Sequence, residues 1–115
     1  MKDEENLWEA SENGNISVVK ELLSIGLLDI NCVLFYPNVK TTPLIVAAKK
    51  GHQDVVQLLL DHGTEIDNAD KSRWTPLSHA ANSGHRVVVK LLLKRGADHN
   101  KLKTSCKIML WKLNQ

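Results

Sequence analysis

The apolar residues of this chain recur in short groups that fit one side of a helix. The stretch "RVVVKLLLKRG" is typical, because its polar positions recur at helical spacing and its apolar residues form one stripe: Val88, Val89, Leu91, Leu92 and Leu93. A helix with such a stripe buries it against a neighbouring element. The pattern predicts six helices, near residues 6–12, 16–24, 43–50, 53–61, 76–83 and 86–94.

The same pattern occurs more than once. The segment "TPLIVAAKKGHQDVVQLLLDHGTE", residues 42–65, returns 33 residues later as "TPLSHAANSGHRVVVKLLLKRGAD", residues 75–98. A third, less regular copy precedes them, "NLWEASENGNISVVKELLSIGLLDIN", in which Gly14 and Gly26 stand 37 residues before their counterparts. A fixed period of this kind indicates a solenoid of stacked repeats.

Local signals within one copy predict where its helices begin and end. The side chain of Thr75 can accept a hydrogen bond from a backbone N–H at a helix start, and Pro76 fits the first turn. Gly84 permits the left-handed conformation that ends a helix. The short helix between them has an apolar side formed by Leu77, Ala80 and Ala81. Because neither helix of a copy can bury its stripe alone, stacked copies should share one core.

The pattern "TPLxxAAxxGHxxVVxLLLxxG" resembles the ankyrin repeat, over roughly residues 5–100. The resemblance implies an all-α solenoid of helix–turn–helix pairs with short projecting β-hairpin fingers. It also implies a non-catalytic module that binds another protein through the fingertips and the concave face of the inner helices. We expect one domain over residues 1–115, with repeats at about 5–31, 38–67 and 71–100 and a C-terminal stub at 101–115. The first copy departs from the pattern, with Glu5-Asn6 in place of Thr-Pro and Asn15 in place of the usual His.

The chain departs from the repeat pattern again near its end. A fourth copy would place Thr-Pro-Leu where Ile108-Met109-Leu110 stand, and only "WKLNQ" follows. We therefore expect the third repeat to be covered by a stub that is either a minimal cap or the remnant of a longer array, and we favour the second view. Because the stub covers that edge only in part, we expect the third repeat to be the least stable unit, whereas a better protected third repeat would indicate that the stub is a competent cap.

The segments that should form the fingers carry candidate binding residues. The longer one, "NCVLFYPNVKTTPL", contains Phe35 and Tyr36, an aromatic pair that suits an interface anchor. Alternatively, these two side chains fold back on the adjacent finger or on the first repeat. The next segment, "NADKSRWTPL", lacks the turn glycine that the family favours and adds three candidates, Lys71, Arg73 and Trp74. Trp74 either anchors a partner or packs on neighbouring hairpins.

The resemblance also assigns variable positions on the concave face. They correspond to Glu9, Glu12 and Asn13 in the first copy, Val46, Lys49 and Lys50 in the second, and His79, Asn82 and Ser83 in the third. The face should thus change from acidic to basic to neutral along the stack and orient a complementary partner. From the second and third copies, the candidate partner contacts are Lys49, Lys50, His79, Asn82 and Ser83.

Composition limits the class of protein. With 43% hydrophobic and 24% charged residues, the chain resembles ordinary folded proteins. Its apolar runs are too short to cross a bilayer, and its acidic start is unlike a secretory signal. Cys32 and Cys106 form no CxxC motif, which suits a reducing compartment. We therefore expect a cytoplasmic or nuclear protein that contacts no membrane.

Charge is distributed unevenly and suggests an alternative function. Residues 1–67 contain five basic and eleven acidic residues, 5 − 11 = −6, whereas residues 68–115 contain ten basic and two acidic residues, 10 − 2 = +8. The basic half could contact nucleic acid or an acidic partner, with Arg86, Lys90 and Lys94 on one helix face. The simpler interpretation is a set of solvated faces.

The sequence offers no signature of catalysis or metal binding. It lacks GxSxG, HExxH and phosphate-binding glycine loops, so we expect no enzyme, no cofactor and no small-molecule substrate. His52 and His85 occupy equivalent positions after glycine, which predicts a repeated structural hydrogen bond. His62, His79 and His99 have no Cys or His at ligand spacing.

Overall fold

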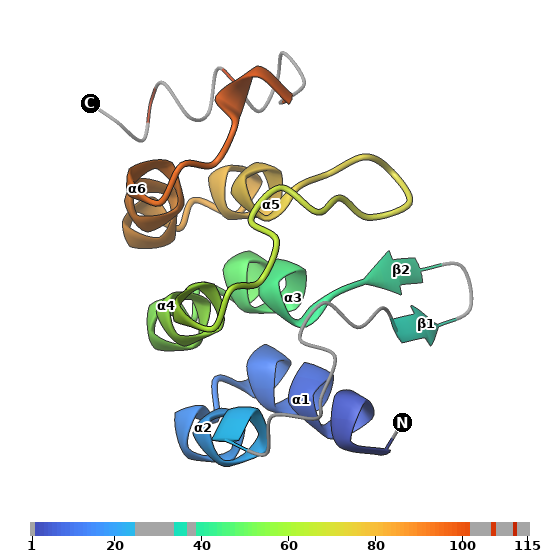
Figure 1. Cartoon of the computed structure of the whole chain (residues 1–115). Coiled ribbons are helices and arrows are strands. Elements are labelled where there is room, and N and C mark those ends of the chain that lie inside the picture. The colour runs from blue at the N-terminus through green and yellow to red at the C-terminus, as the bar shows by residue number, and fades with distance from the viewer. Residues whose placement is uncertain (1, 25–33, 37–38, 102–106, 108–111, 113–115) are drawn as a thin grey trace.

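A computed structural model describes residues 2–24, 34–36, 39–101, 107 and 112. Within these residues the chain forms three pairs of helices, and each pair is joined by a short turn (Figure 1). Their bounds are α1 Lys2–Asn13, α2 Ile16–Ser24, α3 Pro43–Lys50, α4 Gln53–Asp61, α5 Pro76–Asn82 and α6 Arg86–Lys94. A short 3-10 turn, His99–Lys101, follows the last pair.

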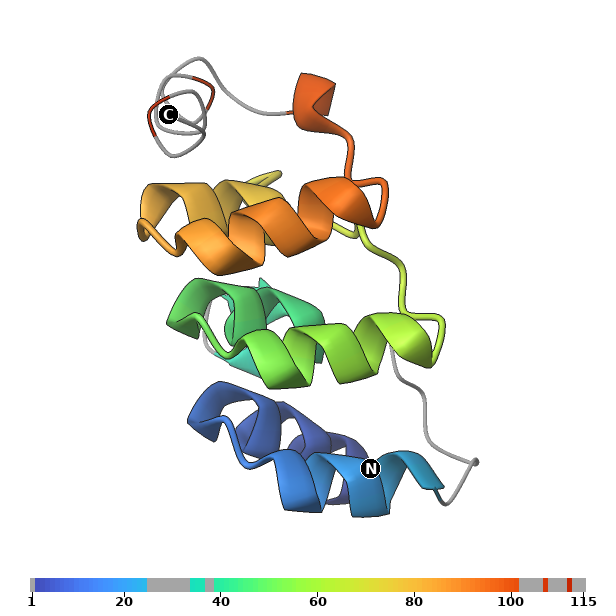
Figure 2. The same cartoon turned by 90° about the vertical axis from the view of Figure 1, so that its left-hand side faces the viewer.

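The helices are arranged in two layers. The inner layer contains α1, α3 and α5, and the outer layer contains α2, α4 and α6, so that the three pairs lie one above another (Figures 1 and 2). Contacts run along each layer, from α1 to α3 to α5 and from α2 to α4 to α6, as well as within each pair. Only neighbouring repeats therefore need to fit one another, as expected for a solenoid.

One continuous hydrophobic core joins the three pairs. It includes residues at equivalent positions of successive repeats, such as Val56 and Val89 or Leu59 and Leu92, all fully buried. In α6, Val88, Val89 and Leu92 are buried, while Leu91 and Leu93 pack against the core from its margin. The prediction of a shared apolar core is confirmed.

Threonine caps begin two of the inner helices, as predicted. The Oγ1 of Thr42 accepts a hydrogen bond from the Ile45 N–H at 3.3 Å, and Pro43 follows in the first turn. Thr75 forms a complete capping box with Ser78, each side chain accepting from the other residue's backbone N–H at 3.2 Å. These bonds satisfy N–H groups that have no partner inside the helix.

The first helix differs from its prediction. It begins at Lys2 rather than near residue 6. The reason is that "KDEEN" contains no helix breaker and its acidic residues favour a helix N-terminus, where the peptide dipoles carry partial positive charge. Without the Thr-Pro pair of the other copies, the sequence gives no sharp start signal. The third inner helix ends at Asn82, one residue before the predicted position.

The segments before α3 and α5 are not alike. Strands β1 (Leu34–Tyr36) and β2 (Val39–Thr41) pair antiparallel before α3, with Phe35 opposite Lys40. The corresponding segment before α5, residues 64–75, contains no strand. β-Hairpin fingers as a feature of every repeat are therefore not confirmed. The apolar residues of the predicted stub, Ile108 to Trp111 and Leu113, lie outside the described residues.

Ser11 is a polar exception within the core. Its side chain is 0% exposed, and its Oγ has no hydrogen-bond partner among the described residues. The equivalent positions in the other repeats hold the buried alanines Ala48 and Ala81. Ser11→Ala should therefore raise the free energy of unfolding by about 1 kcal/mol, because it removes an unsatisfied buried hydroxyl and improves helix propensity.

Urea denaturation of the full chain measures this change, with the exposed Ser17→Ala as a control for helix propensity alone. If Ser11→Ala lowered stability, the hydroxyl would have to make a favourable bond in solution, contrary to this structure.

Candidate protein-binding surface

The exposed positions of the inner layer lie at the last turns of its helices. In α3, Lys49 and Lys50 are exposed, and Asn82 is exposed in α5, with Ser83 directly after it. Because α3 packs against α1 on one side and α5 on the other, these side chains belong to neighbouring rows of one surface. Within the described residues, Arg95 forms an ion pair with Asp61 and His79 forms a hydrogen bond with Asp70, and neither contact involves Lys49 or Lys50.

One predicted member of this surface is wrong. Val46 was expected on the concave face but is only 6% exposed. It lies in the central inner helix, which has a helix packed on both sides, and every residue from 43 to 48 is buried. The equivalent residue of the last described repeat, His79, remains partly exposed. The usable surface of α3 is thus confined to its last turn.

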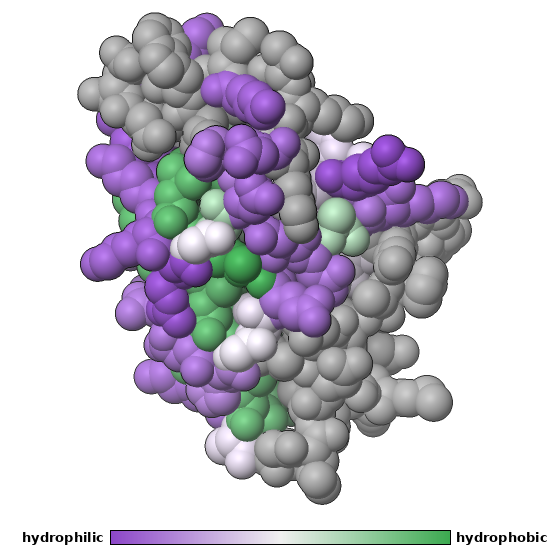
Figure 3. Space-filling model, turned by 45° about the horizontal axis from the view of Figure 1, so that its top comes forward, coloured by the Kyte–Doolittle hydropathy of each residue, from purple (hydrophilic) through white to green (hydrophobic). Residues whose placement is uncertain are grey.

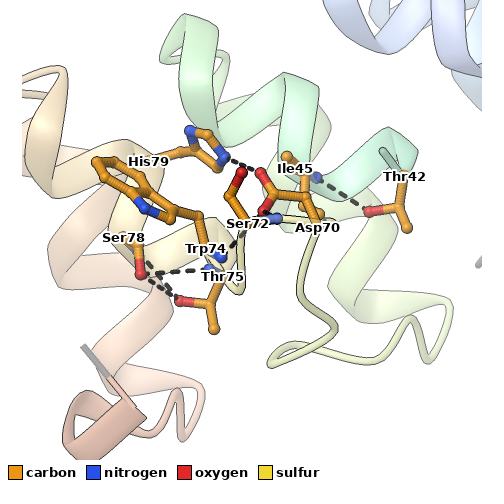
Figure 4. Close-up of polar contacts among 8 residues, drawn as sticks. All are labelled: Thr42, Ile45, Asp70, Ser72, Trp74, Thr75, Ser78 and His79. Atoms are coloured by element: carbon orange, nitrogen blue, oxygen red, sulfur yellow. Dashed lines mark hydrogen bonds and ion pairs between the residues drawn. The ribbon is translucent and has the colours of Figure 1, made fainter. Parts of the chain in front are cut away.

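The segment before α5 is organised by a residue that the sequence analysis missed. Asp70 Oδ1 accepts hydrogen bonds from the backbone N–H groups of Ser72, at 2.9 Å, and Trp74, at 3.0 Å (Figure 4). The backbone of Asp70 also bonds twice across the turn, from its own N–H to the Trp74 carbonyl and from the Arg73 N–H to its carbonyl, each at 2.9 Å. An aspartate at the start of a glycine-poor turn was the available signal, since its side chain can replace backbone partners there.

The other carboxylate oxygen of Asp70 fixes the turn to the inner helix. His79 Nε2 lies 2.7 Å from Asp70 Oδ2, and both side chains are 15% exposed. The Trp74 ring lies against His79, with ring centroids 5.2 Å apart and planes tilted by 47°. Figure 4 shows the carboxylate directed from the loop toward the imidazole. The three residues form a prearranged corner between the loop and α5.

These contacts place two of the candidate residues. Trp74 is partly buried and packs against the core and His79, so its role as a partner anchor stays a prediction. His79 was expected to face a partner, but its Nε2 is engaged by Asp70. Both still present part of their surface at the corner.

Lys71 and Arg73 remain fully at the surface of this loop. Both are exposed. Arg73 adopts a positive φ of 66°, and it alone does so among the non-glycine residues that the structure describes. The absence of the family's turn glycine, noted from the sequence, thus has a structural consequence at this position. Hydrophilic side chains project on the side of the molecule from which the loop extends (Figure 3).

Phe35 and Tyr36 lie in β1, on the hairpin that precedes α3. Their side chains lie outside what the structure describes, so their role as anchors stays a prediction.

The equivalent histidines make the repeated structural bond that was predicted. His52 Nε2 donates to the carbonyl of Glu12 at 2.8 Å, and His85 Nε2 donates to the carbonyl of Lys49 at 3.0 Å. Each bond joins the start of one outer helix to the last turn of the inner helix in the preceding repeat. We call these two contacts the inter-repeat histidine bonds.

The described residues contain no group of three His, Cys, Asp or Glu side chains that could hold a metal ion. An open depression of about 220 Å³ lies between α1 and α2, lined by three Asn residues, by Glu9 and by the apolar Ala10, Val18 and Leu22. None of the described helices is both long enough and apolar enough to span a bilayer.

A comparison with protein families matches residues 7–103 to ankyrin repeats, in three copies. A comparison with curated proteins finds no match. The matched region covers all six helices except the first residues of α1, and it agrees with the two-layered stack described above. The chain belongs to the ankyrin-repeat family.

Proposed function

We propose that this chain is a non-catalytic adaptor or regulator that binds another protein. The binding surface consists of the exposed ends of the inner helices and the two loops that precede α3 and α5. The observation that carries this proposal is the row of exposed polar side chains on a frame held by one core, including Lys49 and Lys50, which form no ion pair with any residue that the structure describes. Ankyrin repeats generally serve as protein-interaction modules, and the family match is consistent with this role.

The frame suits binding because little of it needs to be ordered when a partner arrives. The inner helices α3 and α5 are capped, the loop before α5 is closed by Asp70, and the histidine bonds join neighbouring repeats. A prearranged surface loses less conformational entropy on association. Its charges then select the orientation of a partner more than they add affinity.

We propose that Phe35 and Tyr36 anchor the partner on the hairpin before α3. Replacing both by alanine should weaken binding by about 2 kcal/mol, or roughly 30-fold, because aromatic side chains dominate interface energetics. Capture of partners from cell extract by the two forms, followed by titration of the protein retained by the unmodified chain, measures the difference.

Val87→Ala is the matched control, since Val87 is an exposed apolar residue of the outer layer at 58% exposure. Circular dichroism and urea denaturation verify that the double variant is folded. Equal affinity combined with a large loss of stability would instead support the alternative that the two aromatic side chains pack within the protein.

An alternative function is contact with nucleic acid through α6. Arg86, Lys90 and Lys94 are all exposed on this outer helix. Against this alternative, the neighbouring Arg95 is engaged by Asp61, Nη1 to Oδ1 2.8 Å. Binding to duplex and single-stranded nucleic acid at increasing salt tests it, because phosphate contacts weaken steeply with salt. Either function suits a cytoplasmic or nuclear protein, which remains a proposal.

A further inference from the structure

The backbone of Arg73 is held in a conformation that its side chain disfavours. Its φ of 66° lies in the left-handed region, where a β-carbon crowds the following carbonyl and glycine is the usual residue. Such a residue persists when the surrounding structure fixes it, and in proteins it is found disproportionately at binding sites. The surrounding structure is the turn closed by Asp70, so the arginine is presented at a fixed position.

The acidic and basic side chains of this loop are used differently: two of its carboxylates are hydrogen-bonded within the protein, whereas its cations are exposed. Asp67 Oδ1 accepts from the Asp98 N–H at 2.9 Å, and Asp70 is occupied by two backbone N–H groups and His79. The cations are not so occupied: Lys71 and Arg73 are exposed, and neither takes part in an ion pair within the described residues. We call this pair, Lys71 and Arg73, the cationic turn.

A guanidinium on a rigid turn is well suited to a carboxylate. Its planar fork donates two parallel hydrogen bonds to the two carboxylate oxygens, and less backbone freedom is lost on binding when the turn is already fixed. A long polyanion is a poorer fit, because the carboxylates of Asp67 and Asp70 and the exposed Glu65 lie in the same loop and would repel it. A short acidic segment can contact the turn alone.

We propose that the cationic turn binds an acidic segment of the protein partner, with Arg73 gripping an Asp or Glu carboxylate and Lys71 adding charge. This inference rests on the proposed binding function and specifies its partner chemistry. An arginine at position 73 makes the turn less stable than a glycine would, but it places a cation on the exposed side of the loop.

The two effects of Arg73 can be separated in one variant. Arg73→Gly removes both the strain and the charge, so it should raise the midpoint of thermal unfolding by about 3 °C. The same variant should weaken binding of an acidic peptide by about tenfold, the effect of losing a charge-assisted bond. A site that is only structural would not show gain of stability together with loss of binding.

The probe is a peptide selected from a random displayed library on the full chain. We expect enrichment of Asp and Glu, and weaker binding of the selected peptide at higher salt. Arg73→Lys keeps the charge and should retain part of the affinity. Arg73→Asn tolerates a positive φ but lacks the charge, and it should bind as weakly as Arg73→Gly. Lys90→Ala, an exposed cation on α6, is the control and should bind like the unmodified chain.

The possible failures are distinct. The role of the cationic turn is contradicted if the enriched peptides are neutral or basic, or if they bind Arg73→Gly as tightly as they bind the unmodified chain. If such peptides still depend on Lys49 and Lys50, the proposed binding function stands without it. A selection that enriches no peptide contradicts both. If the chain binds single-stranded nucleic acid more tightly than any acidic peptide, the cationic turn belongs to the alternative function, contact with nucleic acid, and the proposal is wrong.

Discussion

Replacing Gly51 by alanine should lower the free energy of unfolding by about 3 kcal/mol, whereas the same change at Gly84 should lower it by about 1 kcal/mol. Both glycines end an inner helix with positive φ, +79° and +75°, so alanine introduces backbone strain at either position. They differ in their surroundings. A β-carbon at Gly51 would lie 2.6 Å from the Nδ1 of His85, whereas one at Gly84 would meet nothing within 4 Å.

The larger loss of unfolding free energy at Gly51 comes from the inter-repeat histidine bond between His85 and Lys49. The ring of His85 cannot retreat from a new methyl group without losing its 3.0 Å bond to the Lys49 carbonyl. Urea denaturation monitored by circular dichroism measures both variants. In the double variant Gly51→Ala/His85→Ala the losses should be less than additive, because the obstructing ring is gone. Equal losses at Gly51 and Gly84 would show that the ring contact has no energetic weight.

Truncating Leu59 to alanine should cost about 3–4 kcal/mol, a large share of the stability of a domain this size. Leu59 is 0% exposed and lies in α4, which packs against both α2 and α6 as well as α3. A cavity there is bordered by several repeats and cannot collapse from one side. The measurement is again equilibrium urea denaturation.

Val87→Ala, with its side chain 58% exposed, is the matched control and should change stability by less than about 0.5 kcal/mol. A loss below about 1 kcal/mol for Leu59→Ala would mean that the repeats do not share the core described here.

The helices were predictable where short local signals delimit them. Residues 16–24, 43–50, 53–61 and 86–94 were assigned with the same bounds that the structure has, because glycines, and for 43–50 also a Thr-Pro pair, lie close to their ends. The start of α1 was missed since its copy lacks such a pair. The burial of Val46 was also missed, because it depends on helices packed from both sides and not on its own sequence context.

The candidate surface was predictable only in part. The exposure of Lys49, Lys50 and Asn82 follows from their position at the end of a helix, after its two buried alanines. The contact between Asp70 and His79 joins residues of different elements, and no periodicity indicates it. Once His79 and Trp74 are fixed by that contact, the freely exposed candidates of the loop are Lys71 and Arg73.

The inter-repeat histidine bonds bear on how such a chain can grow. A block from Thr42 to Trp74 contains 33 residues, with one histidine that reaches back and one glycine that receives the next histidine. A tandem duplication of this block would therefore supply both halves of every new junction at once. No compensating mutation would be needed at the seam, since His85 already meets Gly51 as His52 meets Gly14. Each 33-residue block thus carries the residues needed for its contacts with the blocks before and after it. Unequal recombination could therefore lengthen the array without disrupting the contact between repeats.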